Sequence, residues 1–225
     1  MPGVAFNPLT WTGRALRRAG TELLRVVSPE GIWIDVGAHR GETTLHHAIR
    51  NPNLKIFAFE PNLQAAVGLT GKACNYIAIP MAIAEADGQT EFHINRFEAA
   101  SSLLPMSEES RRKWKGGEAL AVESTVIVPT IRLDTFMRLA GIERVDYLKI
   151  DAQGMDLAVL RSAGSRLKDV AKITIEVDLS PSPLYVGAAS KSEAIDFLRQ
   201  AGFELLQAEK QTHGQEENLT FVRVK

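Results

Sequence analysis

Residues 32–41 read IWIDVGAHRG, and this stretch decides how the chain is expected to fold. Its apolar first half predicts a short buried strand, and a glycine stands at each end of the turn that follows. Residues 43–50 then have a helical pattern, and residues 55–59, KIFAF, form a second apolar run. Pro61 stops that run and suits the first turn of the next helix. A strand, turn, helix and strand at this spacing predict a βαβ unit of a parallel sheet.

The alternation of strands and helices continues along the chain. Further apolar runs predict strands at residues 76–79, 147–151, 173–177, 203–208 and 218–224. Helical patterns cover residues 133–139, 156–163 and 193–201. Ser190 and Glu193 form a capping box for the last helix, and a polar turn joins the last two strands. The sequence therefore predicts an α/β fold: a mostly parallel sheet with helices on both faces and a C-terminal antiparallel hairpin.

The middle of the chain breaks this regular pattern. Residues 90–94 alternate like a strand, and the β-branched residues 124–128 are expected to pair with them. The polar segment 98–123 lies between the two, and its charged stretch 108–115 predicts a solvated helix face. Long segments of this kind inside a compact domain are more often functional than decorative. We therefore expect a substrate-side insertion at about residues 96–128.

Composition narrows the class of protein. The chain has 225 residues, a net charge of −1 and 45% hydrophobic residues, which excludes disordered and fibrous proteins. The near-neutral charge argues against a nucleic-acid binder, and the single Cys74 fits a reducing compartment. No apolar run suits a membrane span or a signal peptide. We expect a cytoplasmic protein, with residues 31–225 as a single domain after an N-terminal helical extension at residues 1–30, whose helix covers residues 16–27.

Acidic residues and glycines gather where the first two strands end. In an open parallel sheet, ligands bind beyond the carboxyl ends of the strands. Asp35 is placed there to meet a cationic amine, and Gly37 permits a tight turn and close approach of a ligand. Gly41 lets the next helix start against the strand. Glu60, at the end of the second strand, is placed to accept both hydroxyls of a ribose. This set favours a nucleoside that carries an amino acid.

Three blocks of sequence resemble a known family. Residues 34–41 (IDVGAHRG), 59–61 (FEP) and 148–156 (LKIDAQGMD) are similar to the FkbM-type S-adenosylmethionine-dependent methyltransferases. Residues 101–103, 133–134 and 175–177 also match the order of that family, so the resemblance covers about residues 30–180. It implies a seven-stranded Rossmann-like sheet and methyl transfer from S-adenosylmethionine to a hydroxyl of a sugar, glycoconjugate or natural product. The family commonly has Glu where this chain has Gln153, which leaves the role of that carboxylate open here.

The resemblance also implies a set of cofactor-binding residues. They are Asp35, Gly37, Ala38, His39, Gly41, Glu60, Pro61, Ala82, Ile83, Ser101 and Asp151. The glycine turn is expected beneath the methionine part, with Asp35 holding its ammonium directly or through water. Glu60 takes the ribose hydroxyls, and Ala82 and Ile83 flank the adenine. Asp151 is expected beside the methyl sulfonium.

A hydroxyl acceptor must also lose its proton to a general base. The candidates are Asp151, His39 and Glu176, and position favours Asp151. Asp151 is equally interpretable as a cap for the helix that begins near Asp156. Glu176 and Asp178 are equally interpretable as solvated acids at a strand end.

No metal is assigned from the sequence. Asp151, Glu176 and Asp178 are hard oxygen ligands on neighbouring strands, which would suit Mg²⁺, but no compact ligand motif supports such a site. One cysteine and scattered histidines disfavour zinc.

Two other functions compete with O-methylation. A nicotinamide-dependent oxidoreductase is disfavoured because His39 stands at the middle glycine position of the dinucleotide fingerprint. A Tyr-x-x-x-Lys pair is also missing, since Ala189 follows Tyr185 at that spacing. A non-catalytic nucleoside-binding module is supported by Gln153. We expect a small-molecule or saccharide acceptor and no nucleic-acid partner, and the sequence leaves the oligomeric state open.

Overall fold

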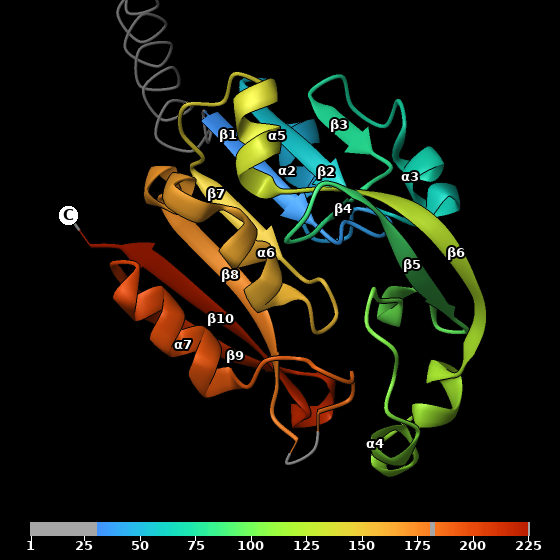
Figure 1. The fold of residues 1–225 in the computed structure, drawn as a ribbon. Helices are drawn as coiled ribbons and strands as arrows, with labels where there is room; N and C mark the ends of the chain where they lie inside the picture. Colours follow the sequence, from blue (N-terminus) through green and yellow to red (C-terminus); the bar gives the residue numbers. More distant parts are fainter. Residues whose placement is uncertain (1–30, 181–182, 225) are drawn as a thin grey trace, which may run out of the picture.

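The computed structural model describes residues 31–180 and 183–224. Seven strands of this part form one sheet in the order β3-β2-β1-β7-β8-β10-β9 (Figure 1). The strands are β1 (Gly31–Val36), β2 (Leu54–Phe59), β3 (Tyr76–Ile79), β7 (Tyr147–Ile150), β8 (Lys172–Asp178), β9 (Phe203–Gln211) and β10 (Glu216–Arg223). The first five run parallel to one another, and β10 is antiparallel to both β8 and β9. The structure confirms the predicted α/β fold with its C-terminal hairpin.

Helices cover both faces of the sheet, where apolar side chains of the central strands β1 and β2 point to either side. On one face, α2 (Leu45–Arg50) and α3 (Leu63–Leu69) pack with Leu54, Ile56 and Ala58 of β2. On the other, α5 (Leu133–Leu139), α6 (Asp156–Ser162) and α7 (Lys191–Gln200) lie in a row (Figure 1). The larger core beneath that row joins Met137, Leu160 and Leu198 to the buried side chains of β1, β7 and β8.

A second, three-stranded sheet stands apart from the first. Here β5 (Gly88–Asn95) pairs antiparallel with β6 (Val122–Ile131), as predicted, and β4 (Ala82–Ile83) pairs parallel with the end of β6. The predicted polar segment between β5 and β6 is not one loop. It contains η1 (Glu98–Ala100), α4 (Glu108–Lys113) and η2 (Gly117–Leu120), and α4 has the charged, exposed face that was expected. Figure 1 shows the β5–β6 ribbon arching away from the main sheet, with α4 near its far end.

Several predicted boundaries shift by one or two residues. Pro61 precedes α3 instead of lying in its first turn, because the Asn62 side chain caps the helix by accepting from the Gln64 N–H. The helix predicted at residues 43–50 begins at Leu45. The Ser190–Glu193 capping box is confirmed. The other turns of the described chain are η3 (Gly164–Asp169) and η4 (Thr212–Gly214).

Two remaining points concern the N-terminal extension and membrane-spanning helices. The extension at residues 1–30, including the helix expected at 16–27, lies outside the described residues. Among the helices of residues 31–180 and 183–224, none is long and apolar enough to cross a membrane.

Candidate active site

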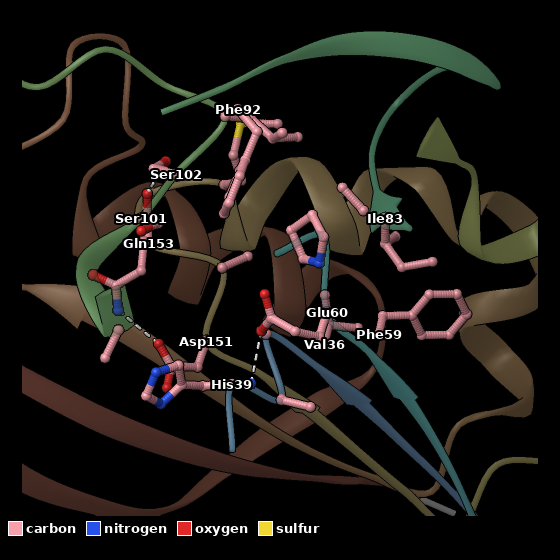
Figure 2. A pocket seen from close by; sticks show the side chains of 18 of the residues that line it. Val36, His39, Phe59, Glu60, Ile83, Phe92, Ser101, Ser102, Asp151 and Gln153 are labelled. Carbon is pink, nitrogen blue, oxygen red and sulfur yellow. Dashed lines mark hydrogen bonds between the residues drawn. The ribbon is translucent and has the colours of Figure 1, made fainter. Parts of the chain in front are cut away.

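A cavity of about 330 Å³ opens at the carboxyl ends of β1, β2 and β7. The strand order reverses at β1, whose neighbours are β2 and β7, so the cavity lies at the topological switch point where parallel sheets bind ligands. Its floor is the turn after β1, and its walls come from the ends of β2 and β7, from β4, and from the β5–η1 segment. In Figure 2, Glu60 lies between a polar group, His39, Asp151 and Gln153, and an apolar group that includes Ile83 and Phe59.

The turn after β1 is held tightly between the two neighbouring strand ends. The backbone N–H groups of Gly37 and Ala38 both donate to the Phe59 carbonyl oxygen at 3.0 Å. Gly37 has φ +75°, and a Cβ built there would lie 1.9 Å from the Asp151 carbonyl oxygen. The sequence predicted that Gly37 admits a ligand to the backbone. The structure shows that what comes close to Gly37 is the end of β7, so this glycine joins the floor of the cavity to Asp151.

Glu60 is 5% exposed and presents its carboxylate at the cavity wall. One oxygen, Oε2, accepts from the His39 backbone N–H at 2.7 Å, and Oε1 accepts from the Asn62 N–H at 2.8 Å (Figure 2). Burial raises the pKa of Glu60, and these two backbone hydrogen bonds act in the opposite direction. The two bonds fix the carboxylate where β2 ends, beside the glycine turn.

Lys149 of β7 ties the floor of the site together. Its ammonium donates to the Gly37 carbonyl oxygen at 2.7 Å and lies 3.1 Å from Asp35 Oδ1 and 3.4 Å from Asp151 Oδ2. Burial acts to lower the pKa of Lys149, but the charges of Asp35 and Asp151 outweigh it and hold the pKa above its usual range. Asp35 is only 1% exposed and accepts a further hydrogen bond from the Thr44 hydroxyl. Its carboxylate therefore faces Lys149 beneath the turn and is not on the cavity wall.

Gln153 connects two acids on the opposite side of the floor. Its Nε2 donates to Asp151 Oδ1 at 2.7 Å and to Glu176 Oε2 at 2.9 Å. Burial acts to raise the pKa of Asp151, yet Lys149 and the Gln153 amide hold it below its usual value. Burial and the neighbouring Asp151 charge raise the pKa of Glu176 to about 10. Asp151 is thus the more acidic member of this interacting pair and Glu176 the more basic one.

The remaining wall is mostly apolar. Ala82 and Ile83 of β4 are buried at the cavity, next to Phe92 of β5. Two serines complete this side: Ser101 Oγ accepts from the Asn95 N–H at 3.1 Å, and Ser102 Oγ donates to the Gln153 carbonyl oxygen at 2.7 Å. An apolar slot beside a buried carboxylate suits a ligand with a flat ring and a polar edge.

The structure gathers most of the residues that the sequence singled out. The cavity wall includes Gly37, Ala38, His39, Glu60, Pro61, Ala82, Ile83, Ser101 and Asp151. Three others lie off this wall: Asp35 beneath the turn, Gly41 behind it, and Glu176 in an adjacent cavity of about 30 Å³. His39, with φ +46°, has its Nδ1 at 2.9 Å from Glu42 Oε1.

Sequence reasoning left several contributors out of the site, among them Lys149 and Phe92. Lys149 is the hub of the floor, and the available signal was a single lysine inside the apolar strand LKI, directly before Asp151. Phe92 lines the cavity from β5, and no local pattern places that strand in one sheet with β4. Within the described ranges, no group of three or more His, Cys, Asp or Glu residues is arranged to hold a metal ion.

Comparisons with known proteins agree with this geometry. The family model described as "Methyltransferase FkbM domain" matches residues 35–205. The 2-O-methyltransferase NoeI of Sinorhizobium fredii is 24% identical over 189 residues, which cover 79% of this chain and 74% of NoeI. The AMB antimetabolite synthetase AmbE of Pseudomonas aeruginosa is 26% identical over 80% of this chain, which spans only 10% of AmbE.

A solved structure shows the same fold. Fibrillarin of Aeropyrum pernix, solved with natively bound S-adenosyl-L-methionine, aligns with a TM-score of 0.50 and 15% identity. The alignment covers 92% of this chain and 74% of fibrillarin.

Proposed function

The chain belongs to the FkbM methyltransferase family and is an S-adenosylmethionine-dependent methyltransferase, and we propose that it methylates a hydroxyl of a saccharide or small natural product. The observation that carries the proposal is the buried carboxylate of Glu60, fixed beside the glycine turn at the switch point of the sheet. The name of NoeI, a 2-O-methyltransferase, supports oxygen as the acceptor atom.

The residues present fit the cofactor. Glu60 would accept the ribose hydroxyls, because its carboxylate borders the cavity and an acid there matches a diol. Ala82 and Ile83 would flank the adenine, and residues 37–39 would lie under the methionine part. When bound, S-adenosylmethionine supplies an electrophilic methyl group on a sulfonium. Asp35 would support the turn through Lys149 instead of holding the cofactor's ammonium directly, since its carboxylate is already engaged beneath the turn.

Asp151 is the proposed proton acceptor. It is half-buried at the cavity wall and its pKa is held low, whereas the pKa of Glu176 is raised and its side chain faces the adjacent small cavity. An acceptor hydroxyl becomes strongly acidic while its oxygen gains the methyl group, so a carboxylate of low basicity suffices at that stage. Holding the hydroxyl in line would contribute much of the rate.

The charges of the cavity support a neutral acceptor. Its wall carries the acids Glu42, Glu60, Glu98 and Asp151, while the ammonium of Lys149 is buried among its partners. An anionic acceptor such as nucleic acid would be repelled here. We also propose that residues 31–225 act as one methyltransferase domain and that the insertion at 96–128 shapes the acceptor side, because Glu98 and Ser101 border the cavity. A cytoplasmic location is proposed from the lone, exposed Cys74.

Thermal unfolding with S-adenosylhomocysteine tests the proposal, with NAD as a parallel ligand. A ligand at 100 times its Kd adds about 2.7 kcal/mol, which is a rise in Tm of roughly 5–10 °C for a domain of this size. We expect the rise with S-adenosylhomocysteine alone. Glu60→Ala should abolish it, while Glu91→Ala, which removes an exposed acid of β5, should not. A rise with NAD alone, or an unchanged rise in Glu60→Ala, would overturn the proposed cofactor site.

A further inference from the structure

Gln153 stands where four separate segments of the chain meet. Its backbone adopts a left-handed conformation, with φ +50°, directly after β7. Its carbonyl oxygen accepts from Ser102 Oγ of the insertion at 2.7 Å, and its side-chain Oε1 accepts from the Tyr185 hydroxyl at 2.7 Å. The amide Nε2 reaches Asp151 and Glu176, as described above. A non-glycine residue in this conformation is uncommon, and its surroundings must hold it there.

Every polar group of the Gln153 side chain makes a hydrogen bond, the amide nitrogen only as a donor and the amide oxygen only as an acceptor. An amide has two N–H donors and one oxygen acceptor. Both donors point at carboxyl groups, and the oxygen faces the Tyr185 hydroxyl, whose single proton is shared between this oxygen at 2.7 Å and the Ala100 carbonyl oxygen at 2.8 Å. Asp151 and Tyr185 together therefore set the direction of the amide. A carboxylate at position 153 has no donors and would add a third acid between Asp151 and Glu176.

Charged and ionisable groups surround the Gln153 amide. Asp151 faces the ammonium of Lys149 on one side and the Gln153 amide on the other. Glu176 faces the amide and lies near the further acids Asp156 and Glu216, whose charges oppose its ionisation. Negative charge thus accumulates on one side of Gln153, and the only cation near Asp151 in the described residues is Lys149 on the other. The amide donates to both Asp151 and Glu176, so it fixes the Asp151 carboxylate toward the cavity while the two acids remain direct neighbours.

We propose that Gln153 is a positioning residue for methyl transfer, which holds the Asp151 carboxylate toward the cavity as the proton acceptor. This inference rests on the proposed function, in which Asp151 takes the proton. In that step the acceptor oxygen forms a bond to the methyl carbon as the sulfur–carbon bond breaks, with its electron pair left on sulfur. The hydroxyl proton passes to Asp151 Oδ, and the electrons of the O–H bond stay on the acceptor oxygen.

The Asp151 carboxyl group has a direct route for its proton to solvent, because the Asp151 side chain borders the cavity and is 35% exposed. The Gln153 amide donates hydrogen bonds to it without titrating at these pH values.

Carbon-13 NMR of the aspartate carboxyl groups tests the inference in the full chain. The Asp151 resonance is assigned by its loss in Asp151→Asn, and its midpoint is followed as a function of pH. Removing one hydrogen bond to the ionised form in Gln153→Ala should raise the midpoint by about one pH unit. Gln153→Glu should raise it further, because a third carboxyl group is added. Tyr185→Phe, which frees the amide to turn, should give a smaller rise. Gln89→Glu, at an exposed site on β5, is the matched control and should leave it unchanged.

Calorimetric titration with S-adenosylhomocysteine tests the proposed cofactor site separately from the role of Gln153. We expect every variant at position 153 to bind within about threefold of the parent, because the amide lies outside the proposed ribose and adenine contacts. An unchanged Asp151 midpoint in variants that bind normally overturns the role of Gln153 and leaves the cofactor site intact. A parent protein that binds no S-adenosylhomocysteine overturns the proposed function, whatever the NMR titration shows. Should Gln153→Glu fail to fold, Gln153→Ala and Tyr185→Phe still decide the outcome.

Discussion

Lys149→Met is the substitution that most directly tests how the floor of the site is built. The Lys149 ammonium is 7% exposed and joins Asp35, the Gly37 carbonyl oxygen and Asp151. Methionine keeps the length and apolar character of the side chain but removes its charge and its donors. Asp35, at 1% exposure, then loses the only cation the described structure places beside it.

The expected loss of stability follows from the burial of Asp35. Breaking a buried ion pair by removing one partner costs about 3–5 kcal/mol, because the other charge is left uncompensated. For a domain of this size each kcal/mol lowers Tm by roughly 2–4 °C, so a fall of about 6–20 °C is expected. The loss of Lys149 should also raise the pKa of Asp151, since that charge is the main influence opposing burial there.

Urea denaturation of the single variants and of the double variant Asp35→Asn/Lys149→Met measures the effect. The double variant removes both charges, and an amide at position 35 can still accept from Thr44, so it should be more stable than Lys149→Met alone. We expect a coupling free energy of at least about 1 kcal/mol. A loss below about 1 kcal/mol in Lys149→Met, or additive effects in the double variant, would refute the idea that Asp35 is held by Lys149.

Two further substitutions probe neighbouring parts of the site. Gly37→Ala should cost about 2–5 kcal/mol in urea denaturation, because the new Cβ meets the Asp151 carbonyl oxygen at 1.9 Å in addition to adopting φ +75°. Gly71→Ala, with φ +76° and nothing within 4 Å, should lose only the backbone part, and equal losses would contradict the packing argument. For Glu176, the folded pKa is raised from 4.5 to about 10, so between these values the folded state keeps a proton that the unfolded chain releases. Its contribution to stability is therefore lost as pH rises, and calorimetry at pH 5, 7 and 9 should show a flatter decline for Glu176→Gln. Parallel declines in parent and variant would show that Glu176 is not protonated.

The local pattern of apolar residues was sufficient to predict the βαβ units. The apolar runs that became β1, β2 and β7 end at the residues that line the cavity, so Glu60 and Asp151 were placed correctly by strand ends alone. Asp35 was not, because a residue within an apolar strand can point to either side of the turn, and only the tertiary contact with Lys149 decides which. The contact between Gly37 and the Asp151 carbonyl oxygen was not predicted for the same reason, because the two residues are more than a hundred positions apart.

The second sheet shows another limit of local patterns. Pairing between β5 and β6 was predictable from alternation, but the strands join β4 instead of the main sheet. With two residues, β4 is too short to give a periodic signal. Phe92 reaches the cavity only because of that unforeseen arrangement.

The floor of the site behaves as one unit because its two ends share atoms. The Gly37 carbonyl oxygen accepts from Lys149, whose ammonium also binds Asp151, and the Gly37 Cα packs against the Asp151 backbone. A displacement of the turn that underlies the proposed cofactor site must therefore move the proposed proton acceptor as well. Gln153 holds the same carboxylate from the opposite side. Asp151 is thus held by Lys149 on one side and by Gln153 on the other, which is the geometry that its proposed role between cofactor and acceptor requires.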